Sequence, residues 1–114
     1  MNRDSIAIEL TGITCVSISE RGHDEVYIKY SIDGGREQRF PENGYYAMSP
    51  GDTWDTSLPI TFKESVIVSL YDSDRGHDDF LGSHTYYPGD SQPESISIPN
   101  TNGASYTLST VAQS

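Results

Sequence analysis

The chain has 114 residues, with 17 acidic and 7 basic side chains and a formal net charge of −10. This length allows one hydrophobic core and leaves no room for another, so we expect a single domain over residues 1–114. The charge disfavours nucleic acid as a partner, because binding to phosphate backbones depends on lysine and arginine side chains, which are few and dispersed here.

Alternating apolar residues predict a series of short β-strands. In chain order, the alternating positions are Ile6, Ile8 and Leu10, then Val26, Ile28, Tyr30 and Ile32, then Leu58, Ile60 and Phe62, then Val66, Val68 and Leu70, then Ile96 and Ile98, and finally Tyr106 and Leu108. Turn sequences occur between runs at residues 33–35, 88–89 and 102–103. About seven or eight short strands, each with one apolar face, predict an all-β fold, an antiparallel two-sheet β-sandwich.

Residues 41–55 show no clear period, and we expect a long surface loop there, with room for a short strand. This segment contains Tyr45, Tyr46 and Trp54. Such rings can form a platform on which a sugar or another ligand stacks, and they can equally cover the end of a sandwich core. The second role is the commoner one.

Two loops have nearly the same sequence. Arg-Gly-His-Asp occurs at residues 21–24 and again at 75–78, and each copy lies between two alternating runs. Both copies are therefore expected in turns between strands, where functional residues tend to gather. The acidic residues in or beside these loops are Glu20, Asp24 and Glu25 in the first copy and Asp72, Asp74, Asp78 and Asp79 in the second.

The second loop places four carboxylates within residues 72–79, with only Arg75 to offset them. Two unit charges about 4 Å apart repel by roughly 4 kcal/mol at an effective dielectric constant near 20. A calcium ion relieves this repulsion, since it takes about six to eight oxygen ligands from short carboxylates and carbonyls in flexible loops. The alternative is a solvated acidic turn with no ion. Because the pattern occurs twice, we favour a metal site.

Other residues with metal-ligating or reactive side chains have simpler interpretations. His23 and His77 could join carboxylates around a zinc ion, but they show no recognised ligand spacing, and we expect both on the surface beside their acids. His84 lies in a strand-like run and is expected to be structural. The only cysteine, Cys15, excludes an intramolecular disulfide and lies in an apolar run that predicts a buried thiol.

The stretch at residues 65–82 resembles part of the C2 domain family. Its strand ends in Asp72-Ser73-Asp74, and the next one begins Asp79-Phe80-Leu81-Gly82, as in C2 domains. Residues 24–29 are similar to the strand that follows the first calcium loop of that family. The resemblance implies a sandwich whose two acidic loops share roughly one to three calcium ions at one end. It also implies Asp72, Asp74 and Asp79 as ligands, with Glu20 and Asp24 or Glu25 from the first loop.

The chain departs from the C2 pattern in several places. The usual Asp-Pro after the first loop is replaced by Asp24-Glu25, the loop after Asp74 is one residue short, and no lysine-rich strand indicates a phosphoinositide surface. No nucleophile lies in a motif that predicts activation, so we expect a binding module and not an enzyme. Its expected partners are calcium and then an anionic membrane surface or a protein. The alternative is a calcium-stiffened structural, adhesive or carbohydrate-binding sandwich.

The sequence also carries expectations about compartment. No apolar stretch of signal-peptide length follows a basic start, and no run is long enough to form a transmembrane segment. We therefore expect a soluble protein that is cytoplasmic, or that is secreted without a visible signal peptide.

Overall fold

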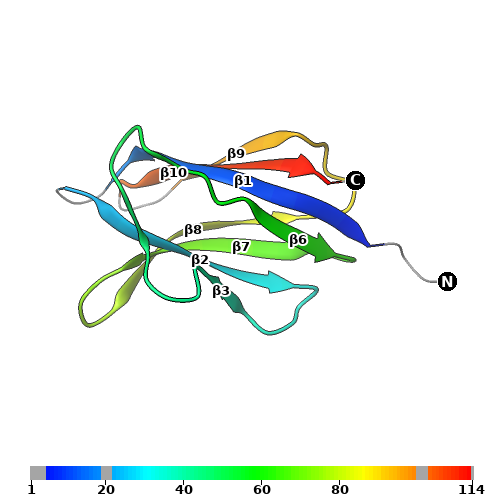
Figure 1. Ribbon diagram of the computed structural model, residues 1–114, viewed down its shortest axis with the longest axis horizontal. Coiled ribbons are helices and arrows are strands. Elements are labelled where there is room, and N and C mark those ends of the chain that lie inside the picture. The colour runs from blue at the N-terminus through cyan, green and yellow to red at the C-terminus, as the bar shows by residue number, and fades with distance from the viewer. Residues whose placement is uncertain (1–4, 19–21, 100–102, 114) are drawn as a thin grey trace.

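The computed structural model describes residues 5–18, 22–99 and 103–113, and within them it is all-β (Figure 1). The strands are β1 (Ile6–Ser17), β2 (Asp24–Ile32), β3 (Gln38–Phe40), β4 (Tyr46–Met48), β5 (Thr53–Trp54), β6 (Leu58–Phe62), β7 (Val66–Ser73), β8 (Asp78–Tyr86), β9 (Glu94–Pro99) and β10 (Ser105–Ala112). None of the described residues belongs to a helix of the length and apolar character needed to cross a membrane.

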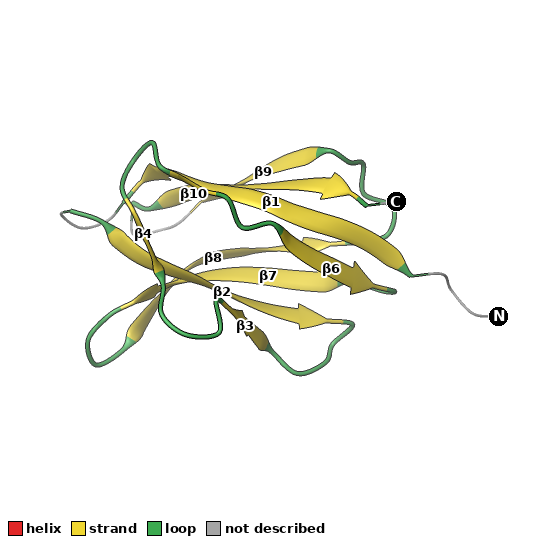
Figure 2. Ribbon diagram, viewed as in Figure 1, coloured by secondary structure: helices red, strands yellow, loops and turns green. Residues whose placement is uncertain are grey.

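The strands form two antiparallel sheets that face each other (Figure 2). One sheet has the order β5-β1-β10-β9, with β6 also paired to β1. The other has the order β3-β2-β7-β8, with β4 also paired to β2. The predicted two-sheet sandwich is confirmed, although the described residues form ten strands instead of seven or eight. The difference arises in residues 38–54, where β3, β4 and β5 are too short to show a period in the sequence.

The inner faces of the two sheets carry the predicted alternating residues. Along β7, for example, Val66, Val68 and Leu70 are fully buried, while Ile67 between the first two is 42% exposed. Burying one such aliphatic side chain contributes about 1.5 to 3 kcal/mol, so the alternation orients each strand. Cys15 is also fully buried in this core, as its apolar run predicted.

The aromatic residues of the segment 41–55 close one edge of the sandwich. The Trp54 ring stacks with Phe40 at a centroid distance of 5.8 Å and with Tyr46 at 5.2 Å. Trp54 is only 7% exposed, and its strand pairs with β1, whereas β4, which carries Tyr46, pairs with β2 of the other sheet. Tyr45 is 50% exposed and takes no part in this stack. The geometry therefore favours the core-covering role over an open platform, because Trp54 is not available to a ligand.

Asp33 joins two turns at the end of the sandwich away from the Arg-Gly-His-Asp loops. Its carboxylate accepts hydrogen bonds from the backbone N–H groups of Glu64 at 2.6 Å, Ser65 at 3.1 Å and Lys63 at 3.0 Å. These bonds, that from Glu64 above all, hold the pKa of Asp33 below its ordinary value. The carboxylate therefore ties the turn after β2 to the turn before β7.

Replacing Asp33 with Asn should lower the melting temperature by several degrees at pH 7, since charged acceptors make the stronger hydrogen bonds. Asn tolerates the positive φ of 50° at this position, so the change in melting temperature measures the loss of the negative charge. Because the folded pKa is depressed, the wild-type advantage is present above the unfolded value near 3.8 and is lost as the pH falls through the folded value. Thermal unfolding at pH 7 and at pH 2 measures both effects. Glu64→Gln, in the same turn, is the matched control, and equal melting temperatures for Asp33→Asn and wild type at pH 7 would contradict the prediction.

Candidate metal centre

The described part of the first Arg-Gly-His-Asp loop, residues 22–24, lies at the same end of the sandwich as the second loop. Val26 of β2 pairs with Asp72 of β7, and the Glu25 N–H donates to Asp72 Oδ1 at 2.7 Å. In Figure 1 the loop between β7 and β8 and the start of β2 lie at the same end of the molecule. Gly22 and Gly76 both adopt positive φ values, 91° and 95°, which explains the glycine in each copy. At this glycine position the two copies therefore share the same backbone conformation.

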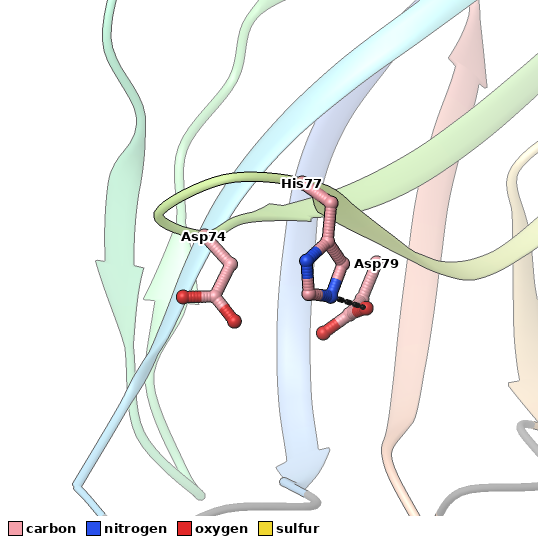
Figure 3. Close-up of side chains that lie close together, drawn as sticks. All are labelled: Asp74, His77 and Asp79. Carbon is pink, nitrogen blue, oxygen red and sulfur yellow. Dashed lines mark ion pairs between the residues drawn. The ribbon is translucent and has the colours of Figure 1, made fainter.

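Three carboxylates of the second loop gather on the inner side of the β7–β8 hairpin. Asp72 and Asp79 are direct register partners, so their side chains lie on the same face. Asp74 and Asp79 place carboxylate oxygens within 4.8 Å of each other and of a His77 ring nitrogen (Figure 3). Asp72 is 3% exposed, which puts one of the three charges at the margin of the core.

The first loop contributes Asp24, which is fully buried at the start of β2. The Tyr106 hydroxyl, from β10 in the opposite sheet, donates a hydrogen bond to Asp24 Oδ2. Burial, and after it this bond, raises the pKa of Tyr106 well above its ordinary value. Asp24 precedes Val26, the partner of Asp72, by two positions, so Asp24 and Asp72 share the inner face. The hydrogen bond between Tyr106 and Asp24 links the two sheets at the acidic end.

Asp78 and Glu25, which the sequence grouped with the other acids, point to the opposite side of their sheet. Asp78 accepts a hydrogen bond from the Tyr27 hydroxyl on the outer face, and this bond is the main cause of the lowered pKa of Asp78. Glu25 hydrogen-bonds to Tyr45 and raises its pKa. Neighbouring residues of a strand face opposite ways, which separates Asp78 from Asp79 and Glu25 from Asp24. Glu20 lies outside the described residues.

The identical Arg-Gly-His-Asp copies are therefore not equivalent in space. The aspartate of the first copy, Asp24, is buried between the sheets, whereas that of the second, Asp78, is exposed on the outer face. On β8 the acidic residue that faces the inner side is Asp79, one position after Asp78. The acids that share the inner side are Asp24, Asp72, Asp74 and Asp79.

His77 lies on the surface beside an acidic neighbour at this end of the molecule, as its sequence context predicted. Its Nε2 atom lies 3.3 Å from Asp79 Oδ1, and its side chain is 71% exposed. A protonated His77 forms an ion pair with Asp79 and competes with a metal ion for that carboxylate. The sequence indicated this contact, because His77 stands between Asp74 and Asp79 in a short turn.

The arrangement is suited to a hard cation. Like charges on directly opposed strand positions destabilise a hairpin, and Asp72 and Asp79 occupy such positions. An ion held by these carboxylates removes the repulsion and gains several oxygen ligands on ordered strand ends. Backbone carbonyls and water complete the coordination sphere of calcium in such loops. The described residues thus offer carboxylate oxygens of the kind that a hard cation prefers.

Solved structures share the arrangement of the whole chain. A C2 domain with 12% sequence identity superposes with a TM-score of 0.59, and the match covers 96% of this chain and 99% of that one. A C2 domain of plant extended synaptotagmin 1 is 8% identical, with a TM-score of 0.58 and coverage of 99% and 97%. The calcium-bound tandem C2 domains of extended synaptotagmin 2 are 12% identical, with a TM-score of 0.62, and the match covers 98% of this chain and 46% of that one.

No protein-family model matches the chain, and no curated protein sequence does. The structural matches, at identities of 8 to 12%, show the fold. The chain has the fold of C2 domains in a divergent form, as the resemblance of residues 65–82 implied.

Proposed function

We propose that the acidic end of this sandwich binds calcium through Asp24, Asp72, Asp74 and Asp79. Two observations carry the proposal. Asp72 and Asp79 are direct register partners, and carboxylate oxygens of Asp74 and Asp79 lie within 4.8 Å of each other. One structure with the same fold, that of the tandem C2 domains of extended synaptotagmin 2, is calcium-bound, which supports the choice of ion. We expect roughly one to three bound ions, the number that the resemblance to C2 domains implies.

The calcium-loaded end then serves as a binding surface for anionic lipid headgroups. A chain with a net charge of −10 is repelled by an anionic membrane, so bound cations must bridge the two surfaces. Coordination positions that the protein leaves open are available to phosphate or carboxylate oxygens. A protein partner and a purely structural role for calcium are the other outcomes that the experiments below distinguish.

Calorimetric titration of calcium into chelator-stripped protein tests the ion site. We expect binding in the micromolar to millimolar range, and its loss in Asp72→Asn combined with Asp74→Asn. The matched control is Asp55→Asn combined with Glu64→Gln, which removes the same number of charges from exposed positions outside the acidic loops. Unchanged heats in the Asp72/Asp74 variant, or equal losses in the control, would show that calcium binds elsewhere or only through net charge.

Sedimentation with vesicles tests the partner. Vesicles rich in phosphatidylserine should carry the protein down in the presence of calcium and not after chelation, and neutral phosphatidylcholine vesicles should not carry it down in either condition. Calcium binding without any sedimentation would favour the structural or adhesive role, or a protein partner.

A further inference from the structure

A second group of metal-ligating side chains lies at the opposite end of the sandwich. It consists of His84 near the end of β8, Asp90 in the following loop and Glu94 at the start of β9. One ligand atom from each residue lies within 4.8 Å of the others, and all three side chains are partly buried. Figure 1 shows the β8–β9 connection at the end of the molecule away from the β7–β8 loop. Because β8 and β9 belong to different sheets, this group spans the two layers.

Two buried polar atoms at this end have no partner among the described residues. They are Glu94 Oε1 and the hydroxyl oxygen of Tyr86, a residue that is only 1% exposed. The Thr110 hydroxyl donates to Gln92 Oε1 at 2.7 Å and also lies close enough to Tyr86 to lower its pKa. An unsatisfied buried polar atom destabilises a fold by about 1 to 3 kcal/mol, and a charged one by more. Such atoms call for a further partner, which is a bound water molecule or a ligand.

Tyr86 lies close to the three ligating residues. Its ring meets the His84 ring edge-on at a centroid distance of 4.6 Å. Burial, and after it the charges of Glu94 and Asp90, raises the pKa of Tyr86. The hydroxyl thus lies in the field of both carboxylates, and the ring that carries it packs against the imidazole. This buried donor is a second observation, independent of the acidic residues themselves.

The ligating residues are already positioned by the backbone. Asp90 Oδ2 accepts a hydrogen bond from Tyr87 N at 2.8 Å, and Asp90 N donates to Tyr87 O at 3.1 Å, so the turn is closed on both sides. Asp90 Oδ1 is left for another ligand. His84 pairs with Val68 and Glu94 pairs with Thr110, which places these two residues on ordered strands of the two sheets. Little conformational entropy remains to be lost when an ion binds.

We propose that His84, Asp90 and Glu94 bind a zinc ion, with the Tyr86 hydroxyl hydrogen-bonded to a water molecule in the fourth coordination position. One imidazole nitrogen and two carboxylate oxygens are a donor set that zinc accepts at about 2.0 to 2.2 Å, and three protein ligands leave one position open. Calcium suits this group less well, because it needs about six to eight oxygen ligands. A tetrahedral zinc site separates its ligand atoms by roughly 3.4 Å, so ligand atoms that lie within 4.8 Å of one another need to move by at most about 1.4 Å.

Zinc at this position would join the two sheets where β8 passes into β9. It binds the folded chain and not an unfolded one in which the three residues are apart, so the melting temperature should rise with zinc concentration. The inference is independent of calcium at the acidic end. The double variant Asp72→Asn with Asp74→Asn should therefore still bind zinc at this site.

The test is a calorimetric titration of zinc into chelator-stripped full-length protein, with cobalt absorption as a second readout of tetrahedral nitrogen and oxygen ligation. We expect one zinc ion per chain at this site, and binding weakened at least about tenfold in His84→Gln and in Glu94→Gln. The matched control is His77→Gln, which removes an imidazole that lies beside two carboxylates at the other end. It should leave the zinc affinity of the β8–β9 site unchanged.

The outcomes of this titration are distinct. Loss of binding in His84→Gln with retention in His77→Gln supports the site, whereas the reverse result, or no zinc binding by the wild type, overturns it. Glu94→Gln keeps the shape of the side chain and removes a charge from a partly buried position, so its apo form should melt no lower than the wild type. If His84→Gln does not fold, Glu94→Gln decides, and undiminished zinc binding in that variant overturns the proposal.

Discussion

Trp54→Ala should lower the free energy of unfolding by about 3 to 5 kcal/mol, a large part of the stability of a domain of this size. The reason is the position of the indole ring, which is 7% exposed and stacks with Phe40 and Tyr46 where the edges of the two sheets meet. Truncation leaves a cavity at this edge and removes both stacking contacts. Urea denaturation followed by circular dichroism measures the loss.

Tyr45→Ala is the control for Trp54→Ala, because Tyr45 belongs to the same segment but is 50% exposed. It should change the free energy of unfolding by no more than about 0.5 kcal/mol. The pair distinguishes the two roles that the sequence left open for these aromatic residues. A small effect of Trp54→Ala on stability, together with the loss of sugar binding, would instead support the role as a ligand-stacking platform.

The stability of the domain should fall steeply above pH 10. Tyr27, Tyr86 and Tyr106 are 2%, 1% and 0% exposed, and their pKa values are raised, that of Tyr27 to about 12. The first cause in each case is burial, and the carboxylates Asp78, Glu94 and Asp24 add to it. A group with a raised folded pKa stabilises the fold below its unfolded pKa, here 10.0, and the contribution is lost as the pH rises.

The slope that each such tyrosine contributes begins near pH 10 and approaches about 1.4 kcal/mol per pH unit, or about 4 kcal/mol per pH unit for the three. Denaturation with urea at pH 8, 10 and 11, with tyrosinate absorbance recorded in parallel, measures this slope. The variant Tyr106→Phe should reduce it by about 1.4 kcal/mol per pH unit. It should also destabilise the fold at pH 7 by about 1 to 3 kcal/mol, since Asp24 loses a buried donor. Equal stability at pH 8 and pH 11 would contradict the explanation.

The sequence carried enough information for the fold class because burial alternates along the longer strands. In β7 and β10 every second residue is buried, and the hydrophobic effect forces this period onto any strand with one face in a core. The short edge strands β3 to β5 were not predicted as such, since two or three residues cannot show a period. Their positions depend on pairing with β1 and β2, which is a tertiary property.

Part of the acidic end could be read from the sequence in the same way. The two loops were expected to lie together, and the structure brings Asp72 into register with both Val26 and Asp79. The division of the acids between the faces was missed, although the period of two could have separated Asp78 from Asp79. The calcium assignment of these residues stays a prediction until the titration is done.

The sequence by itself determined an all-β chain with two acidic turns, because strand periodicity and charge crowding are local properties that follow from residue order. Only the tertiary structure decided which carboxylates share a face, which aromatic ring is buried, and where His84, Asp90 and Glu94 meet. These last three residues follow no motif, and they are brought together only where the chain crosses from one sheet to the other. Contacts of that kind depend on the packing of two layers, which no local pattern encodes.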